Sequence, residues 1–208
     1  MISPAFKQYF VPLGEWPADV RKYYEYNPEE AKRLLGEAGY AAGFETVLTP
    51  YVVPGKVYDT EEFVIDNLSR VGIRAKMNIG EYGAYINAVW VEGKYTGIHQ
   101  GPTSHDYEVD DQAYGWYHSK GAFSGRLRIN DPKVEDLAAR QRQEMDPAKR
   151  KGILRELQLY LAGIQPMCPL PRPTGQRIIT HPWVKNFNLR QFNLDSAVSY
   201  ERVWVDRR

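Results

Sequence analysis

The fold is decided by residues 44–79, which read FETVLTPYVVPGKVYDTEEFVIDNLSRVGIRAKMNI. The segment 44–49 predicts a short strand, and a Pro-Gly turn follows it. Residues 59–72 place apolar side chains on one helical face and end at a glycine, whereas 73–79 alternate apolar and polar side chains with the period of a half-buried strand. A strand, a helix and a strand within 36 residues predict a βαβ unit with a right-handed crossover.

On the N-terminal side, Asn27-Pro28-Glu29-Glu30 predicts a capped helix that ends at Gly39. The segment before it, up to Glu25, is rich in proline and aromatic residues without periodicity, and we expect it to be extended. On the C-terminal side, helical spacing over 82–89 is followed by a strand at 95–100. The sheet therefore continues beyond the βαβ unit.

Two further helices are predicted from Asp131-Pro132, through Met145, and from Asp146-Pro147. Strands are expected near 167–170 and 177–180. Together the elements predict an α/β class, with helices flanking a sheet. Cys168 falls in one of these apolar runs, and we expect it to be buried and inert.

Composition excludes several classes of protein. With 208 residues, no repeat and no low-complexity linker, the chain fits one domain or one lobe of a larger protein. Its formal net charge of +1 gives no clustered excess of cations for nucleic acid. No stretch approaches the roughly 20 apolar residues that span a bilayer, and the first ten residues lack the pattern of a signal peptide. A single cysteine allows neither an intrachain disulfide nor a Cys-rich zinc site.

The region 101–130 is the candidate site. About 30 residues there lack a sustained period, and long loops in compact domains tend to be functional. The region also leaves the carboxyl end of the predicted strand 95–100, where ligands bind in open α/β sheets.

Catalysis has little support in this region. Asp106, Asp110 and Asp111 with His105 could serve a small α/β hydrolase, but adjacent aspartates point apart in most backbones. The histidines match no specific metal pattern, and neither a serine nucleophile elbow nor a glycine-rich phosphate loop is present. We therefore expect a non-enzymatic protein without a metal or cofactor.

Several motifs resemble the second lobe of family 5 extracellular solute-binding proteins, the oligopeptide, dipeptide and nickel receptors of ABC importers. They are 26–40 (YNPEEAKRLLGEAGY), 43–45 (GFE), 68–73 (LSRVGI), 130–137 (NDPKVEDL), 146–150 (DPAKR) and 181–187 (HPWVKNF). The resemblance covers most of the chain in order and spacing.

The resemblance implies a periplasmic-binding-protein-like class II lobe with a mixed sheet. Residues 1–208 would then be a single C-terminal lobe, a fragment of a two-lobed receptor whose signal peptide and first lobe precede it. The tail 181–208 would return to that first lobe. Without it, we expect the tail to expose apolar surface and to favour self-association.

The resemblance also implies ligand residues. Asp106-Tyr107 matches an Asp-Tyr pair whose aspartate binds the α-ammonium of a peptide ligand, a charge-assisted bond. The stretch 101–105 departs from the family pattern, because it lacks the usual tryptophan. The candidate ligand-binding residues are Asp106, Tyr107, His105, Thr103, Trp116 and Arg126.

The interpretation is a substrate-binding component of an ABC importer that captures an oligopeptide-like solute by lobe closure. Its partners would be the solute and an ABC permease. The full-length protein would be periplasmic or extracellular and associated with the membrane. The alternatives are an oligosaccharide receptor of the same family and the small hydrolase.

Overall fold

The predicted βαβ unit forms the centre of a three-stranded sheet in the computed structural model, which describes residues 2–4, 6–102, 108–170, 181–186 and 203–206. Strands β1 (Phe44–Pro50) and β2 (Ile73–Met77) pair in parallel with helix α3 (Asp59–Ser69) between them in the chain. Strand β3 (Ile98–Gln100) pairs in parallel with the other edge of β1, so the strand order is β2-β1-β3.

Apolar and polar residues alternate along β2, and their burial alternates as predicted. Its apolar residues are half-buried, whereas Arg74 and Lys76 are exposed and lie within 4 Å of the Glu45 carboxylate on β1. Leu48 of the central strand is fully buried. The α/β class and the parallel sheet are confirmed, and among the described residues antiparallel pairing occurs only in a separate two-stranded sheet.

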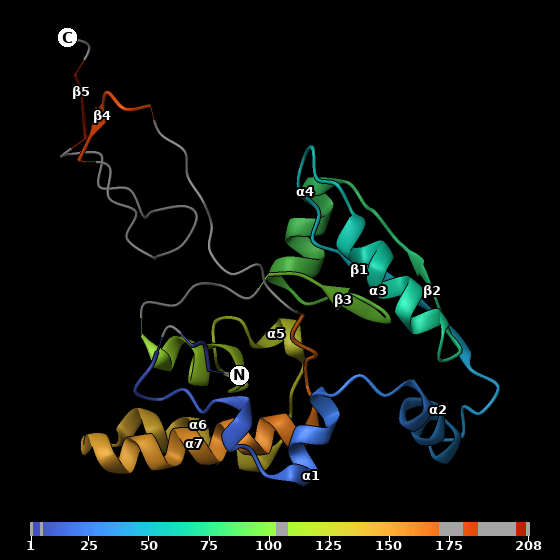
Figure 1. The fold of residues 1–208 in the computed structure, drawn as a ribbon, viewed down its shortest axis with the longest axis horizontal. Helices are drawn as coiled ribbons and strands as arrows, with labels where there is room; N and C mark the ends of the chain where they lie inside the picture. The colour runs from blue at the N-terminus through green and yellow to red at the C-terminus, as the bar shows by residue number, and fades with distance from the viewer. Residues whose placement is uncertain (1, 5, 103–107, 171–180, 187–202, 207–208) are drawn as a thin grey trace.

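Helices precede and follow the strands of this layer in the chain, and Figure 1 shows α2 (Pro28–Glu37) apart from the sheet. Helix α2 begins as predicted, because the Asn27 side chain accepts a hydrogen bond of 3.0 Å from the Glu30 amide. After β2, helix α4 (Tyr82–Ala84) continues into the π-helical segment η3 (Tyr85–Val91). The helix and strand predicted for 82–100 are thus present, with the strand shorter than expected.

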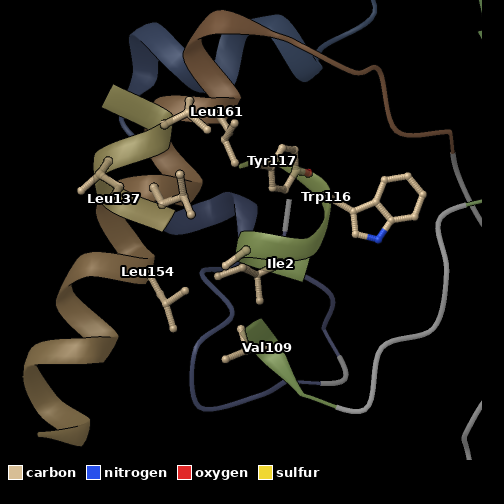
Figure 2. Packing of buried hydrophobic residues seen from close by; sticks show 10 residues of the cluster. Ile2, Val109, Trp116, Tyr117, Leu137, Leu154 and Leu161 are labelled. Carbon is tan, nitrogen blue, oxygen red and sulfur yellow. The ribbon is translucent and has the colours of Figure 1, made fainter. Parts of the chain in front are cut away.

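A second layer is helical and contains the larger of two hydrophobic clusters that the described residues form (Figures 1 and 2). Helices α6 (Pro132–Gln143) and α7 (Pro147–Ile164) pack against each other, and Asp131 and Asp146 cap them as predicted. The π-helical segment η4 (Asp111–Trp116) and helix α5 (Ser124–Leu127) complete this layer. The core consists of Ile2, Val109, Ala113, Trp116, Tyr117, Val134, Leu137, Leu154, Leu157 and Leu161.

The prediction of an extended N-terminal segment was wrong. It contains η1 (Leu13–Glu15), α1 (Ala18–Arg21) and η2 (Lys22–Tyr24), which are too short to show helical periodicity in the sequence. Gln158 of α7 fixes the segment, because its side chain accepts a hydrogen bond from the Val11 amide and donates one to the Val11 carbonyl.

Two predictions around α6 and α7 were also wrong. Met145 lies beyond the end of α6 and is 89% exposed. Residues 167–170 form no strand, since no described strand lies beside them to pair with, and Cys168 is exposed rather than buried. The strand predicted at 177–180 lies outside the described residues.

Strands β4 (Val184–Lys185) and β5 (Trp204–Val205) form a small antiparallel sheet, which Figure 1 shows apart from both layers. Trp183, Trp204 and Val205 are 43%, 48% and 50% exposed. The described part of the tail therefore exposes apolar side chains, as predicted. No helix in the described ranges is long and apolar enough to cross a membrane.

Candidate functional site

Aromatic rings gather where β1 ends and along β3. Tyr51 follows β1, Tyr85 and Trp90 come from η3, and Tyr95 and His99 precede and occupy β3. The Tyr51 ring centre lies 5.0 Å from that of Trp90 and 5.8 Å from that of Tyr85, and the Tyr95 and His99 ring centres are 5.1 Å apart. These five residues are called the aromatic cluster below.

Arg126 of α5 enters the aromatic cluster from the helical layer. Its guanidinium carbon lies 3.6 Å from the centre of the Trp90 ring, and 4.7 Å and 5.3 Å from those of Phe123 and Trp116. Its Nε donates a 2.8 Å hydrogen bond to the Trp90 carbonyl oxygen. The Tyr95 hydroxyl donates one of 2.6 Å to the Arg126 carbonyl oxygen. The two layers are therefore joined at this arginine.

The pKa values of the titratable groups at this site are shifted by burial and by the charge of Arg126. Desolvation, with a smaller contribution from the Arg126 charge, lowers the pKa of His99 to about 4, so its imidazole is neutral at pH 7. Its Nε2 lies 3.0 Å from the Tyr85 hydroxyl, and burial raises the pKa of that phenol. Burial lowers the Arg126 pKa, but from an ordinary value so high that the side chain stays charged.

Two buried polar atoms, one on the arginine inside the aromatic cluster and one at the end of the neighbouring strand β3, lack a hydrogen-bond partner among the described residues. They are Nη1 of Arg126 and Oε1 of Gln100, the last residue of β3. A buried polar group without a partner is costly, so such atoms indicate a missing acceptor and a missing donor. The arrangement suits a polar ligand held among aromatic faces.

Two of the predicted ligand residues, Arg126 and Trp116, lie at this candidate site. Arg126 lies at its centre, and Trp116 lies against the guanidinium but is only 6% exposed. Trp116 belongs to the helical core cluster, and Figure 2 shows its ring at the edge of that cluster. The other predicted ligand residues, Thr103, His105, Asp106 and Tyr107, lie outside the described residues.

The aromatic cluster itself was missed, because it comes from three separate segments. One signal could have found part of it. Tyr51 stands just after the predicted strand 44–49, and His99 lies near the end of the predicted strand 95–100; the carboxyl ends of parallel strands meet at one edge of a sheet.

The acidic residues proposed for a hydrolase have structural partners. The Asp110 carboxylate accepts hydrogen bonds from Gln141 at 2.6 Å and from Arg142 at 3.0 Å. Asp111 accepts one of 3.2 Å from the Glu108 amide. These contacts attach the segment to α6 and organise its turn. Within the described ranges no group of three His, Cys, Asp or Glu side chains is placed to hold a metal ion.

A shallow groove of about 250 Å³ lies elsewhere, between η2, α2 and α3. Tyr23, Tyr26, Leu34 and Val71 contribute to its lining, and no buried polar atom without a partner faces it among the described residues. The groove therefore lacks the unmet hydrogen bonding that marks the aromatic cluster.

Comparison with known proteins identifies a family whose profile matches this chain. The profile of the bacterial extracellular solute-binding proteins, family 5 middle region, matches residues 5–124. The glutathione-binding protein GsiB of Shigella dysenteriae is 26% identical over an alignment of 186 residues, and the match covers 82% of this chain and 36% of that protein. The chain therefore spans about a third of the length of this curated relative.

Solved structures show the same architecture. HbpA2 from Haemophilus parasuis superposes with a TM-score of 0.61 at 27% identity, over 76% of this chain and 31% of that one. The oligopeptide-binding protein AppA from Bacillus subtilis, solved with a nonapeptide, gives 0.64 at 18% identity, over 79% and 34%. At that identity the second comparison shows the fold alone.

Proposed function

The chain belongs to the family 5 bacterial extracellular solute-binding proteins, and on that premise we propose that it forms one wall of the binding site of an ABC-importer receptor for a peptide-like solute. The observation that carries the proposal is the aromatic cluster around Arg126 where β1 ends and along β3, with the Arg126 Nη1 buried and without a hydrogen-bond partner among the described residues. Ligands of open α/β sheets bind at such strand ends.

Capture requires no chemistry on the ligand. Aromatic faces cover apolar parts of a solute, while a few polar groups fix its orientation. Asp106, six residues after Gln100, is proposed to bind the α-ammonium of the peptide, with Thr103, His105 and Tyr107 beside it. The curated relative is named for binding glutathione, itself a tripeptide, which supports this class of ligand.

The second wall is proposed to be the first lobe of a longer receptor, which closes over the ligand by a hinge motion. The exposed Trp183 and Trp204 of the tail suit a segment that docks on that lobe. In its absence we expect the tails to associate with each other. The complete receptor is proposed to work outside the cytoplasm, periplasmic or extracellular and associated with the membrane, and to deliver its solute to an ABC permease.

Titration of the 208-residue chain with reduced glutathione, trialanine and mannohexaose, followed by amide NMR, tests the proposal. We expect saturable shifts with a peptide at residues of the aromatic cluster. Asp106→Asn should weaken peptide binding roughly tenfold, the effect of losing a charged hydrogen bond. The control is Asp136→Asn, an exposed α6 position paired with Arg140, which should leave binding unchanged.

Each alternative predicts a different result. Shifts with mannohexaose alone would identify an oligosaccharide receptor. Cleavage of trialanine during the titration, abolished in Asp106→Asn, would identify a hydrolase.

A further inference from the structure

Two rings of the aromatic cluster come from one helical segment and meet the same pair of neighbours. Tyr85 and Trp90 both belong to η3. The Tyr85 ring centre lies 5.8 Å from that of Tyr51 and 6.1 Å from that of His99. The Trp90 ring centre lies 5.0 Å and 6.2 Å from the same two rings. Tyr85 and Trp90 therefore project from one face of η3, although they are five residues apart.

An α-helix would not present these two side chains together. With about 3.6 residues per turn, each residue rotates an α-helix by about 100°, so residues five apart lie about 140° from each other around its axis. A π-helix bonds each residue to the fifth one along, so residues five apart lie roughly one turn apart on the same side. The Asn87 carbonyl accepts such a bond, 3.3 Å long, from the Glu92 amide. The π-helical register is therefore what brings the two rings to one face.

The same register leaves the Trp90 carbonyl oxygen available to Arg126. In an α-helix that continued through this point, the Lys94 amide would bond that oxygen. In the structure the Lys94 amide instead donates a hydrogen bond of 2.8 Å to the Ala88 carbonyl. The Trp90 carbonyl accepts the hydrogen bond from Arg126 Nε. The end of η3 thus positions both the ring and the carbonyl against which Arg126 packs.

We infer that one residue between Tyr85 and Trp90 is an insertion into an α-helical segment, and that the π-helical register it imposes positions the aromatic cluster for ligand binding. Of the four intervening residues only Asn87 is exposed, so its removal takes away no packed side chain. Asn87 is thus a positioning residue that acts through Tyr85 and Trp90. Its role in ligand binding rests on the proposed function, whereas the register of η3 stands without it.

Deleting Asn87 and inserting an alanine after it should have opposite effects. After the deletion, Trp90 follows Tyr85 by four residues, which is about 40° around an α-helix, so both rings should still meet Tyr51. After the insertion it follows by six residues, and its ring should turn away from Tyr51 in either kind of helix. In an ordinary α-helix, a deletion and an insertion each rotate the residues that follow by about 100° and are equally harmful.

Nuclear Overhauser effects among the rings of Tyr51, Tyr85 and Trp90 report the register in the ligand-free, 208-residue chain. We expect effects from Tyr51 to both rings in the unaltered chain and in the deletion variant. The insertion variant should lose the effect between Tyr51 and Trp90. The inference is overturned if that effect is absent from the unaltered chain, or if the deletion variant loses it or fails to fold.

A deletion in an ordinary α-helix provides the control. Glu156 is exposed and lies in α7 between the buried residues Leu154 and Leu157. Its deletion should rotate these two leucines relative to each other by about 100° and lower the melting temperature sharply. Deletion of Asn87 should leave the melting temperature close to that of the unaltered chain. Equal losses in the two deletion variants would contradict an insertion in η3.

Titration with trialanine tests the role in ligand binding. The deletion variant should bind as tightly as the unaltered chain, and the insertion variant roughly tenfold more weakly or worse, because the ligand loses an aromatic face. Unchanged affinity in the insertion variant would overturn the positioning role. An unaltered chain that binds no peptide would overturn the proposed function and this role with it, while the ring contacts would still decide the register.

Discussion

The guanidinium carbon of Arg126 lies 3.6 Å from the centre of the Trp90 ring, while its Nε donates a hydrogen bond of 2.8 Å to the carbonyl oxygen of the same residue. One side chain thus contacts both the ring and the backbone of a residue 36 positions earlier. This double contact joins the helical layer to the sheet layer and places the positive charge inside the aromatic cluster. The stability of the cluster and its affinity for a ligand are therefore expected to change together.

The protonation of His99 should make the stability of the chain depend on pH. Its pKa is lowered to about 4 in the folded state, mainly by burial, whereas an unfolded histidine titrates near about 6.5. Between these values the unfolded chain binds the proton and the folded chain does not, so the free energy of unfolding falls as the pH is lowered from about 6.5 towards 4. Urea denaturation at several pH values measures this slope.

The comparison variant is His99→Gln, which keeps a polar side chain but cannot titrate in this range. The free energy of unfolding of this variant should change less with pH, between about 6.5 and 4, than that of the unaltered chain. Identical slopes would show that His99 titrates normally.

Lys56 and Glu61 should be strongly coupled. Glu61 is fully buried, its Oε1 accepts a hydrogen bond from Lys56, and the same ammonium donates one of 3.0 Å to the Tyr51 carbonyl. Lys56→Met leaves the carboxylate buried without its partner, which typically costs about 3–5 kcal/mol. The double variant Lys56→Met, Glu61→Leu should lose less stability than the sum of the two single changes.

Chemical denaturation of the four proteins in this cycle gives the coupling energy. Additive losses would show that the two side chains act independently. Because Lys56 also holds the Tyr51 backbone, the ring resonances of Tyr51 should shift in Lys56→Met.

Gly93 should tolerate no side chain. It has a φ of +66°, and a Cβ atom there would lie 1.9 Å from the Gly125 carbonyl oxygen of the neighbouring α5 region. Gly93→Ala must therefore displace α5 and with it Arg126, so we expect a lower melting temperature and altered Trp90 fluorescence. Gly152→Ala is the matched control, because it lies in α7 with nothing within 4 Å, and it should stabilise the helix by about 0.5–1 kcal/mol. A Gly93→Ala protein as stable as the unaltered chain would contradict the close approach.

Leu154→Ala should strongly lower the stability of the chain, because it removes a side chain from the helical core. This α7 residue is fully buried in the main cluster, and Leu→Ala changes at such sites cost about 2–5 kcal/mol. Met145→Ala, at a side chain that is 89% exposed, should change stability by less than about 0.5 kcal/mol. Denaturation midpoints compare the two variants, and similar losses would mean that Leu154 is not in the core.

The elements predicted correctly are those whose signal is local. Asp131-Pro132 and Asp146-Pro147 mark helix starts, because the capping side chain and the fixed proline φ act within one turn. The alternation along β2 indicated which side chains are exposed, since a strand presents successive residues to opposite faces. The prediction for the N-terminal segment was wrong for the same reason. Helical turns of three or four residues are too short to show a periodic pattern in the sequence.

The sequence by itself therefore determined the βαβ unit and the two long helices, and its candidate region 101–130 supplies Arg126 and Trp116 beside the aromatic cluster. The tertiary structure decided which side chains make up that site. Tyr51, Trp90 and Arg126 lie far apart in the chain and meet only when α5 packs against η3. No local pattern encodes that meeting, and the Nη1 of Arg126 lacks a hydrogen-bond partner among the described residues only once burial has removed it from water.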